Sequence, residues 1–133
     1  MDEDRAATIV IGGKEYPLML TTRATREIGK RYGGLGDLGE KLMKSENFEQ
    51  ALDEIIWLVT LLANQAILIH NFQHRDDKTG QRALITDEEI ELMTSPHELG
   101  AYKDAIIECL SRGTKRMVES EDEIGSVKNA GSA

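Results

Sequence analysis

The sequence is poor in aromatic residues, in proline and in cysteine, and each shortage excludes a class of protein. Aromatic residues make up 5% of the 133 residues, so the core must be built from aliphatic side chains. Two prolines and a hydrophobic content of 40% are typical of a globular chain and exclude a disordered one. The one cysteine, Cys109, cannot form an internal disulfide, and its apolar surroundings predict a small buried hydrophobe.

Positive charge is also scarce in this chain. It has 16 lysine and arginine residues against 24 aspartate and glutamate residues, which gives a formal net charge of −8. The electrostatic field of such a protein repels nucleic-acid phosphates and anionic lipid, and it favours basic partners and solubility. We therefore expect no nucleic-acid partner and no membrane partner.

The sequence shows neither a secretory signal nor a membrane span. Residues 1–5 are acidic, whereas a signal peptide needs a positive segment followed by an apolar one. The longest apolar stretch, residues 55–72, is interrupted by polar residues. These are Thr60, Asn64, Gln65, His70 and Asn71. A bilayer would leave those polar groups without partners, so we predict a buried core helix in a cytoplasmic protein.

Two short β-favouring runs near the N-terminus predict a hairpin over residues 8–20. The turn between them contains Gly12 and Gly13, which adopt the positive φ angles of a tight hairpin turn at little steric cost. Pro17 has no backbone N–H to donate, so its position should lie at a solvent-facing edge of the sheet.

Apolar spacing and capping residues predict five helices after the hairpin. Their approximate bounds are residues 22–32, 36–44, 47–74, 86–94 and 96–117. Gly33 ends the first of them, and Thr86 and Ser95 begin capping boxes ahead of the last two. The long third helix keeps an apolar face for about six turns and is the predicted centre of the fold.

Together these elements predict a mainly α fold with a small N-terminal β-hairpin, an α+β arrangement in which a compact helical bundle surrounds one long central helix. A chain of this length fits a single globular domain, which we place at residues 6–118. Residues 1–5 are expected to be a flexible N-terminus. Residues 119–133 are polar, small and acidic, and they are expected to form a disordered tail.

No residue pattern in the chain predicts catalysis, a cofactor or a metal. His70 and His74 lie four residues apart, a spacing that suits a shared metal ion, but the glutamate and third ligand of a zinc motif are absent. The glycine cluster at residues 33–36 lacks the lysine and hydroxyl of a phosphate-binding loop. We therefore predict that the protein is not an enzyme and binds no cofactor.

Two features of the sequence are candidates for partner binding. Arg23, Arg26 and Lys30 are spaced three and four residues apart, so they share one face of the first predicted helix. That face is either a docking patch for an acidic partner or a solvated helix surface. Trp57 lies inside the central helix and is expected in the core, but if it is exposed it becomes an interface anchor.

Three segments together resemble the tail assembly chaperones of long-tailed phages and prophages of Gram-positive bacteria. They are the hairpin at residues 9–22, the helix end Lys-Arg-Tyr-Gly-Gly at residues 30–34, and the apolar run at residues 51–65. The resemblance covers residues 6 to about 123. Its motifs are structural, so it carries no active-site residue.

The resemblance implies a helper protein that associates with the tape measure protein while a phage tail is built. Such a protein keeps the long hydrophobic helices of its partner soluble in the cytoplasm of the host bacterium, and it is absent from the mature virion. The resemblance also implies tail tube subunits as partners. An acidic helical domain with an apolar groove suits this role, because it covers a hydrophobic helix while its charge maintains solubility.

The resemblance further implies two products of different length, since members of the family are often extended by a programmed frameshift. Residues 127–129, Val-Lys-Asn, are compatible with the codons GUA-AAA-AAC, which contain the slippery heptamer A-AAA-AAC. An ordinary polar terminus is the alternative. The gene sequence distinguishes the two, because a GUC or AAG codon there removes this slip site.

Two other functions are alternatives. In the first alternative, an edge of the hairpin pairs with another copy of the chain, and the protein is a self-assembling structural subunit and a homo-oligomer. It is a small acidic regulator or inhibitor of a basic partner if its acidic side chains gather on one continuous face. The sequence disfavours this regulator, because acidic residues alternate with lysine and arginine over most of the chain.

Overall fold

The described chain begins with a two-stranded antiparallel hairpin, as predicted. The computed structural model describes residues 6–44 and 48–113, and within them β1 (Ala6–Ile11) pairs with β2 (Lys14–Met19). The two turn residues, Gly12 and Gly13, have φ angles of +57° and +82°. Two successive positive φ angles give the tight turn whose twist matches that of the paired strands, which explains the two glycines.

Both outer edges of the hairpin are obstructed. In a two-residue hairpin the residues that flank the turn form a hydrogen-bonded pair, and bonded and non-bonded pairs alternate from there. Pro17, which lies opposite Thr8, therefore directs its nitrogen outward, where it has no hydrogen to donate. On the other edge, the Tyr102 hydroxyl donates to the Val10 carbonyl. A strand added to either edge would meet a missing donor or an occupied acceptor, which disfavours self-assembly through the hairpin.

Two short helices follow the hairpin, and the end of the first confirms the predicted stop at Gly33. α1 spans Thr22–Tyr32, and α2 spans Leu35–Lys44. The Thr21 hydroxyl caps α1 by accepting a hydrogen bond from a backbone N–H of the first turn at 3.0 Å. Gly33, with a φ angle of +91°, closes α1, and its N–H donates to the Gly29 carbonyl at 2.8 Å.

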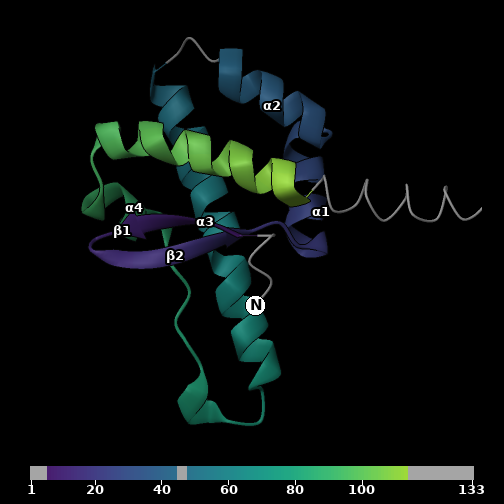
Figure 1. Ribbon diagram of the computed structural model, residues 1–133, viewed down its shortest axis with the longest axis vertical. Coiled ribbons are helices and arrows are strands. Elements are labelled where there is room, and N and C mark those ends of the chain that lie inside the picture. The colour runs from purple at the N-terminus through teal and green to yellow at the C-terminus, as the bar shows by residue number, and fades with distance from the viewer. Residues whose placement is uncertain (1–5, 45–47, 114–133) are drawn as a thin grey trace, which may run out of the picture.

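The central element is α3 (Phe48–Gln73), which packs against β2, α1 and α4 (Asp87–Met93), as Figure 1 shows. Length and composition alone would allow α3 to cross a membrane, since its most apolar window has a mean hydropathy of 1.6. The core helix of a soluble domain passes the same test, and 39% of that window is buried inside the structure. The observed ends of α3 agree with the predicted ones to within a residue.

Beyond α3 the chain turns back and runs alongside it. A short 3₁₀ turn, η2 (Lys78–Gly80), is followed by an extended segment that leads into α4. The Thr86 hydroxyl caps α4 by accepting a hydrogen bond from the Glu89 N–H at 3.1 Å, as the predicted capping box requires. A last helix begins at residue 96 and continues to residue 113, where the described chain ends.

Three predicted segments lie outside the described residues. They are the flexible N-terminus at residues 1–5, the end of the last helix at residue 117 and the tail at residues 119–133. The predicted fold class is confirmed, because the described chain is mostly helical and its N-terminal hairpin packs against the long central helix.

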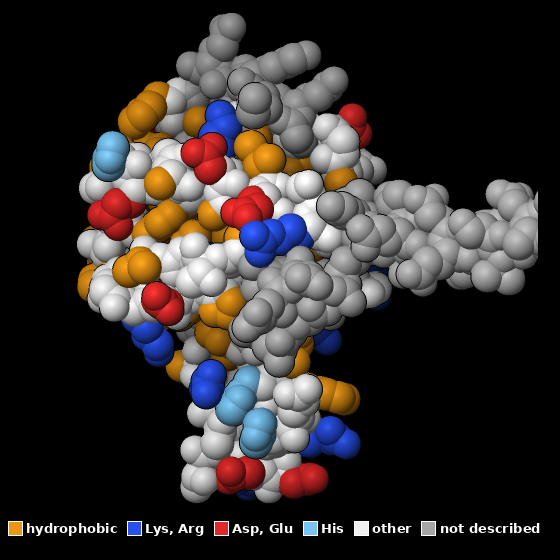
Figure 2. Space-filling view, in the orientation of Figure 1, with side chains coloured by type: hydrophobic (Ala, Val, Ile, Leu, Met, Phe, Trp, Pro, Cys, Tyr) orange, Lys and Arg blue, Asp and Glu red, His pale blue; other side chains and the backbone are white. Residues whose placement is uncertain are grey.

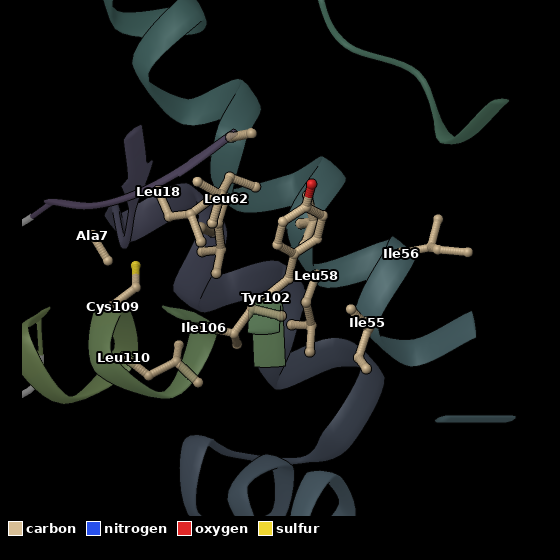
Figure 3. Close-up of a cluster of buried hydrophobic side chains, with 14 of the residues drawn as sticks. Ala7, Leu18, Ile55, Ile56, Leu58, Leu62, Tyr102, Ile106, Cys109 and Leu110 are labelled. Atoms are coloured by element: carbon tan, nitrogen blue, oxygen red, sulfur yellow. The ribbon is translucent and has the colours of Figure 1, made fainter. Parts of the chain in front are cut away.

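An aliphatic core joins the hairpin to the helices (Figure 3). Leu18 of β2, Leu62 of α3 and Ile106 of the last described helix meet there, and all three are fully buried. Cys109 lies in the same cluster and is also buried, as predicted for a small hydrophobe. The core therefore lies between the hairpin, residues 55–63 of α3 and the last described helix.

Candidate partner-binding groove

The two halves of α3 differ in how much of their surface the fold covers. Most side chains between residues 55 and 63 are buried, whereas every side chain from residue 66 to residue 71 is half-buried and Phe72 is 67% exposed. Three consecutive apolar residues, at 67–69, belong to the half-buried set. In Figure 1 the C-terminal half of α3 extends below the hairpin, and the returning chain runs beside it. A helix that is apolar on all sides and only half-covered is typical of a surface that another molecule completes.

Two asparagines hold the returning chain against α3. The Asn64 side chain accepts from the Ile85 N–H at 2.7 Å and donates to the Ile85 carbonyl at 2.9 Å. Asn71 makes the same pair of bonds with Arg82, at 2.8 and 2.9 Å. Seven residues of helix rise about 10.5 Å and three residues of extended chain span about 10 Å, so the two spacings match. We call residues 81–86 the strap.

Further hydrogen bonds fix the turn that precedes the strap. The Gln81 side chain donates to the His74 carbonyl at 2.7 Å, at the C-terminal end of α3. The hydroxyl and the backbone N–H of Thr79 both donate to the Asp77 carboxylate, and these bonds lower the pKa of Asp77. Residues 74–79 of this turn are exposed, but the backbone of the turn is tied to the helix.

The histidine pair on α3 is engaged with backbone carbonyls. The rings of His70 and His74 stack with their centroids 4.2 Å apart. One ring nitrogen of His70 lies 2.8 Å from the Gly80 carbonyl oxygen, and one of His74 lies 2.8 Å from the carbonyl oxygen of His70. Within the described ranges no group of three His, Cys, Asp or Glu side chains is arranged to hold a metal ion.

An open hollow of about 400 Å³ lies between α1, α3 and the strap, and we call it the α3 groove. Its floor contains Trp57, Leu61 and Leu68, whose spacings of four and seven residues place them on one side of α3. Its walls are Arg23 and Glu27 on one side and Leu84 and Asp87 on the other. The groove thus combines an apolar floor with charged walls.

Hydrogen bonds from α3 place the two walls on opposite sides of this floor. Successive residues of a helix lie about 100° apart, so Asn64 and Gln65 diverge around the helix axis. Gln65, which is 3% exposed, accepts from the Thr21 hydroxyl at 2.5 Å and meets the start of α1. Asn64 binds the strap, and Thr60 donates to the Asp87 carboxylate at 2.7 Å at the start of α4. The floor therefore runs between α1 and the strap.

Trp57 packs against the core with part of its ring and lines the groove with another part. The Arg31 guanidinium lies over the indole, 4.5 Å from the ring centroid, and the Tyr32 ring meets it edge-on at 5.9 Å. Arg31 and Tyr32 both donate to the Glu54 carboxylate. Because a cation over an indole is attracted to its ring electrons, these contacts hold Trp57 in one orientation.

The structure brings together two of the four candidate residues from the sequence. Arg23 and Trp57 line the same groove. Arg26 and Lys30 are exposed on α1 but do not line it, and Lys30 forms an ion pair with Glu27 at 3.3 Å. Partner binding by any of the four stays a prediction.

Sequence reasoning missed the other residues that line the groove, among them Leu61, Leu68, Leu84 and Asp87. Leu61 and Leu68 follow Trp57 at helical spacing, but apolar residues occur on every side of α3 and give no sign of which side the fold leaves open. Leu84 and Asp87 reach the groove because the strap folds back along α3. No short-range pattern in the sequence predicts that return.

A larger hollow of about 770 Å³ lies on the other side of the strap. It is lined by Met19 of β2 and by Ile69 and His70 from the opposite side of α3. Leu84, which is 45% exposed, lines both hollows and forms the ridge between them. This second hollow includes Pro17 at the obstructed edge of β2, so it offers no regular strand edge to a partner.

A separate apolar patch lies near the turn of the hairpin. Leu92 and Met93 of α4 are 75% and 55% exposed, and Val10 of β1 is 48% exposed. Met93 lies against the turn, because a Cβ atom at Gly12 would come within 2.8 Å of its terminal methyl group. None of these exposed residues lines either hollow, so the α3 groove is the stronger candidate for a binding site.

The side chains that line the α3 groove suit non-covalent recognition of an apolar surface. Its floor is apolar, its charged side chains stand on the walls, and the polar side chains of Asn64 and Gln65 are occupied by the strap and by α1. Such a site suits the apolar face of a helix. Comparisons with protein-family models, with curated proteins and with solved structures find no match for this chain.

Proposed function

We propose that this chain is a phage tail assembly chaperone that binds apolar helical segments of the tape measure protein in the α3 groove. The observation that carries the proposal is the half-covered apolar side of α3, with Trp57, Leu61 and Leu68 along an open hollow. The resemblance of the sequence to tail assembly chaperones supports the same role.

The physical reason is a match between two incomplete surfaces. A tape measure helix exposes apolar residues at spacings of three and four, and the groove presents its own apolar residues at helical spacing. Burial of both surfaces favours the complex, and the net charge of −8 keeps it soluble. We place this complex in the cytoplasm of the host, with the chaperone absent from the mature virion. Tail tube subunits and a longer frameshifted form of the chain are its other proposed partners.

Co-expression tests the proposal. The chain is expressed with the tape measure protein of its own locus, and pull-down with light scattering measures whether a soluble complex forms. We expect a soluble complex with the unaltered chain and with Leu92→Glu, because Leu92 is 75% exposed and lies outside the groove. Leu68→Glu is the matched variant inside the groove, and we expect it to leave the tape measure protein aggregated.

A chain that stays monodisperse while the tape measure protein aggregates would contradict the proposal. The two alternatives have less support from the described residues. Self-assembly through the hairpin meets the obstructed edges at Pro17 and Val10. Figure 2 shows hydrophobic side chains mixed with charges of both signs over the face that carries the hairpin and the last described helix, whereas an acidic regulator needs a continuous acidic face.

A further inference from the structure

Arg23 occupies a position that is unfavourable for a cation within the fold. It belongs to the first turn of α1, where the helix dipole presents partial positive charge, and that turn contains no acidic residue. The side chain is exposed, and no described residue forms an ion pair with it. A residue that opposes a local rule without local compensation is expected at a functional site.

The helix that contributes to the opposite wall of the groove is acidic. α4 has four acidic residues and no basic one, and its first residue, Asp87, lines the groove. α1 has four cationic residues and a single acidic one, Glu27. Although Glu27 lines the groove beside Arg23, the apolar floor lies between a mainly basic helix and an acidic helix, so we expect the electrostatic potential to change sign across it.

We infer that the groove selects an amphipathic helix whose apolar stripe has acidic residues along one flank and basic residues along the other. The acidic flank contacts Arg23, and the basic flank contacts Asp87. This inference rests on the proposed function and specifies the chemistry of the partner helix. It also fixes the direction of the bound helix, because turning the helix end for end would exchange its flanks and place like charges together.

Three synthetic helical peptides with one identical leucine stripe test the inference. The first has glutamate on one flank and lysine on the other, the second has glutamate on both flanks, and the third has lysine on both. Each is titrated into the full chain at about 0.15 M salt, where screening confines charge effects to about 8 Å. The emission of Trp57 reports binding, because it is the one tryptophan of the chain and it lines the groove.

We expect the mixed-charge peptide to bind at least tenfold more tightly than either single-charge peptide. In Arg23→Glu both walls are acidic, so the peptide with lysine on both flanks should become the tightest ligand. Arg23→Gln should reduce the advantage of the mixed-charge peptide without reversing it. Arg26→Glu is the matched control on the same helix, outside the groove lining, and it should leave the order of affinities unchanged.

Each contrary outcome has a distinct meaning. Equal affinities for the three peptides would overturn the charge inference and leave the apolar groove as the proposed site. No response of Trp57 to any peptide, from a chain that still solubilises the tape measure protein, would overturn the inference and place binding elsewhere. Trp57 emission that changes as the chain alone is diluted, together with a dimeric mass in light scattering, would assign the groove to a second copy and overturn the inference as well.

Discussion

The N-terminal and C-terminal halves of α3 are built from the same kinds of residue, yet the fold treats them differently. From Ile55 to Ala63 the helix is enclosed by the hairpin and the last described helix, and most of its side chains are buried. From Ala66 to Asn71 the side chains are half-buried, and the strap and β2 lie beside them. Apolar side chains of the same helix therefore form the core in one part and stay half-exposed in the other.

The strap makes this division stable. A half-covered apolar helix risks aggregation, and the strap covers one side of it through bonds from Asn64 and Asn71 to its backbone. The floor at Leu61 and Leu68 stays open and is the surface that we propose for a partner. The following predictions test whether the two halves differ in stability and in binding as this account requires.

The largest effect is expected from leucine truncation in the enclosed half. Leu62 is fully buried, so Leu62→Ala should lower the free energy of unfolding by about 2–5 kcal/mol. Leu68 is half-buried in the groove, and Leu68→Ala should cost about 1 kcal/mol while weakening partner binding. Urea denaturation measures the first quantity, and pull-down of the tape measure protein measures the second. Similar losses of stability in the two variants would contradict the division of α3.

The next largest effect is expected at the strap. Asn64→Ala removes both bonds to the backbone of the buried Ile85, which should cost about 1–3 kcal/mol. Asn71→Ala removes the equivalent bonds to exposed Arg82, and should cost about 0.5–1.5 kcal/mol. Hydrogen exchange should become faster at the Ile85 amide in Asn64→Ala and at the Arg82 amide in Asn71→Ala. Unchanged exchange at both amides would mean that the strap is held by other contacts.

A smaller effect is expected at Tyr102, which covers the enclosed half of α3 (Figure 3). Burial, with a contribution from the Glu98 carboxylate, raises the pKa of Tyr102 from 10.0 to about 12. The stability that Tyr102 contributes is therefore present below pH 10 and is lost as the pH rises through 12, because the unfolded chain loses its proton first.

Tyr102→Phe separates this contribution from other titrations. The variant loses the hydrogen bond to Val10 and should be about 0.5–1.5 kcal/mol less stable near neutral pH. Between pH 10 and pH 12 its stability should fall less steeply than that of the unaltered chain. Denaturation measures the free energy of unfolding of both proteins as a function of pH. Equal slopes for the two proteins between pH 10 and pH 12 would contradict the raised pKa of Tyr102.

The smallest effect is expected at Lys30. Its ion pair with Glu27 is exposed, so Lys30→Ala should change stability by less than about 0.5 kcal/mol. Because Lys30 does not line the groove, affinity for the mixed-charge peptide should also change little. A loss of affinity comparable with that of Arg23→Gln would extend the binding surface along α1 and revise the limits of the groove.

Most of the fold could be predicted from the sequence because its signals are local. The paired glycines of the hairpin turn, the caps at Thr21 and Thr86 and the helix stop at Gly33 each act within a few residues. Apolar spacing then gave the long central helix to within a residue at each end.

The groove could not be predicted in the same way, because it depends on where distant segments lie. In the sequence, Asn64 and Asn71 are polar interruptions of an apolar stretch. They can bind the backbone of the strap only because the chain folds back along α3 after residue 75. Trp57 is half-buried because α1 brings Arg31 over its ring. Helical spacing makes Arg23 a candidate binding residue, whereas its position across the floor from Asp87 is a tertiary feature.

Methyl NMR of the chain, with and without an apolar helical segment of the tape measure protein, tests the central claim most directly. The account predicts that signals of Leu61, Leu68 and Leu84 shift on binding, while those of Leu92 and Met93 stay unchanged. Shifts at Leu92 and Met93, with the three groove leucines unaffected, would contradict the claim and move the binding surface to the patch beside the hairpin turn.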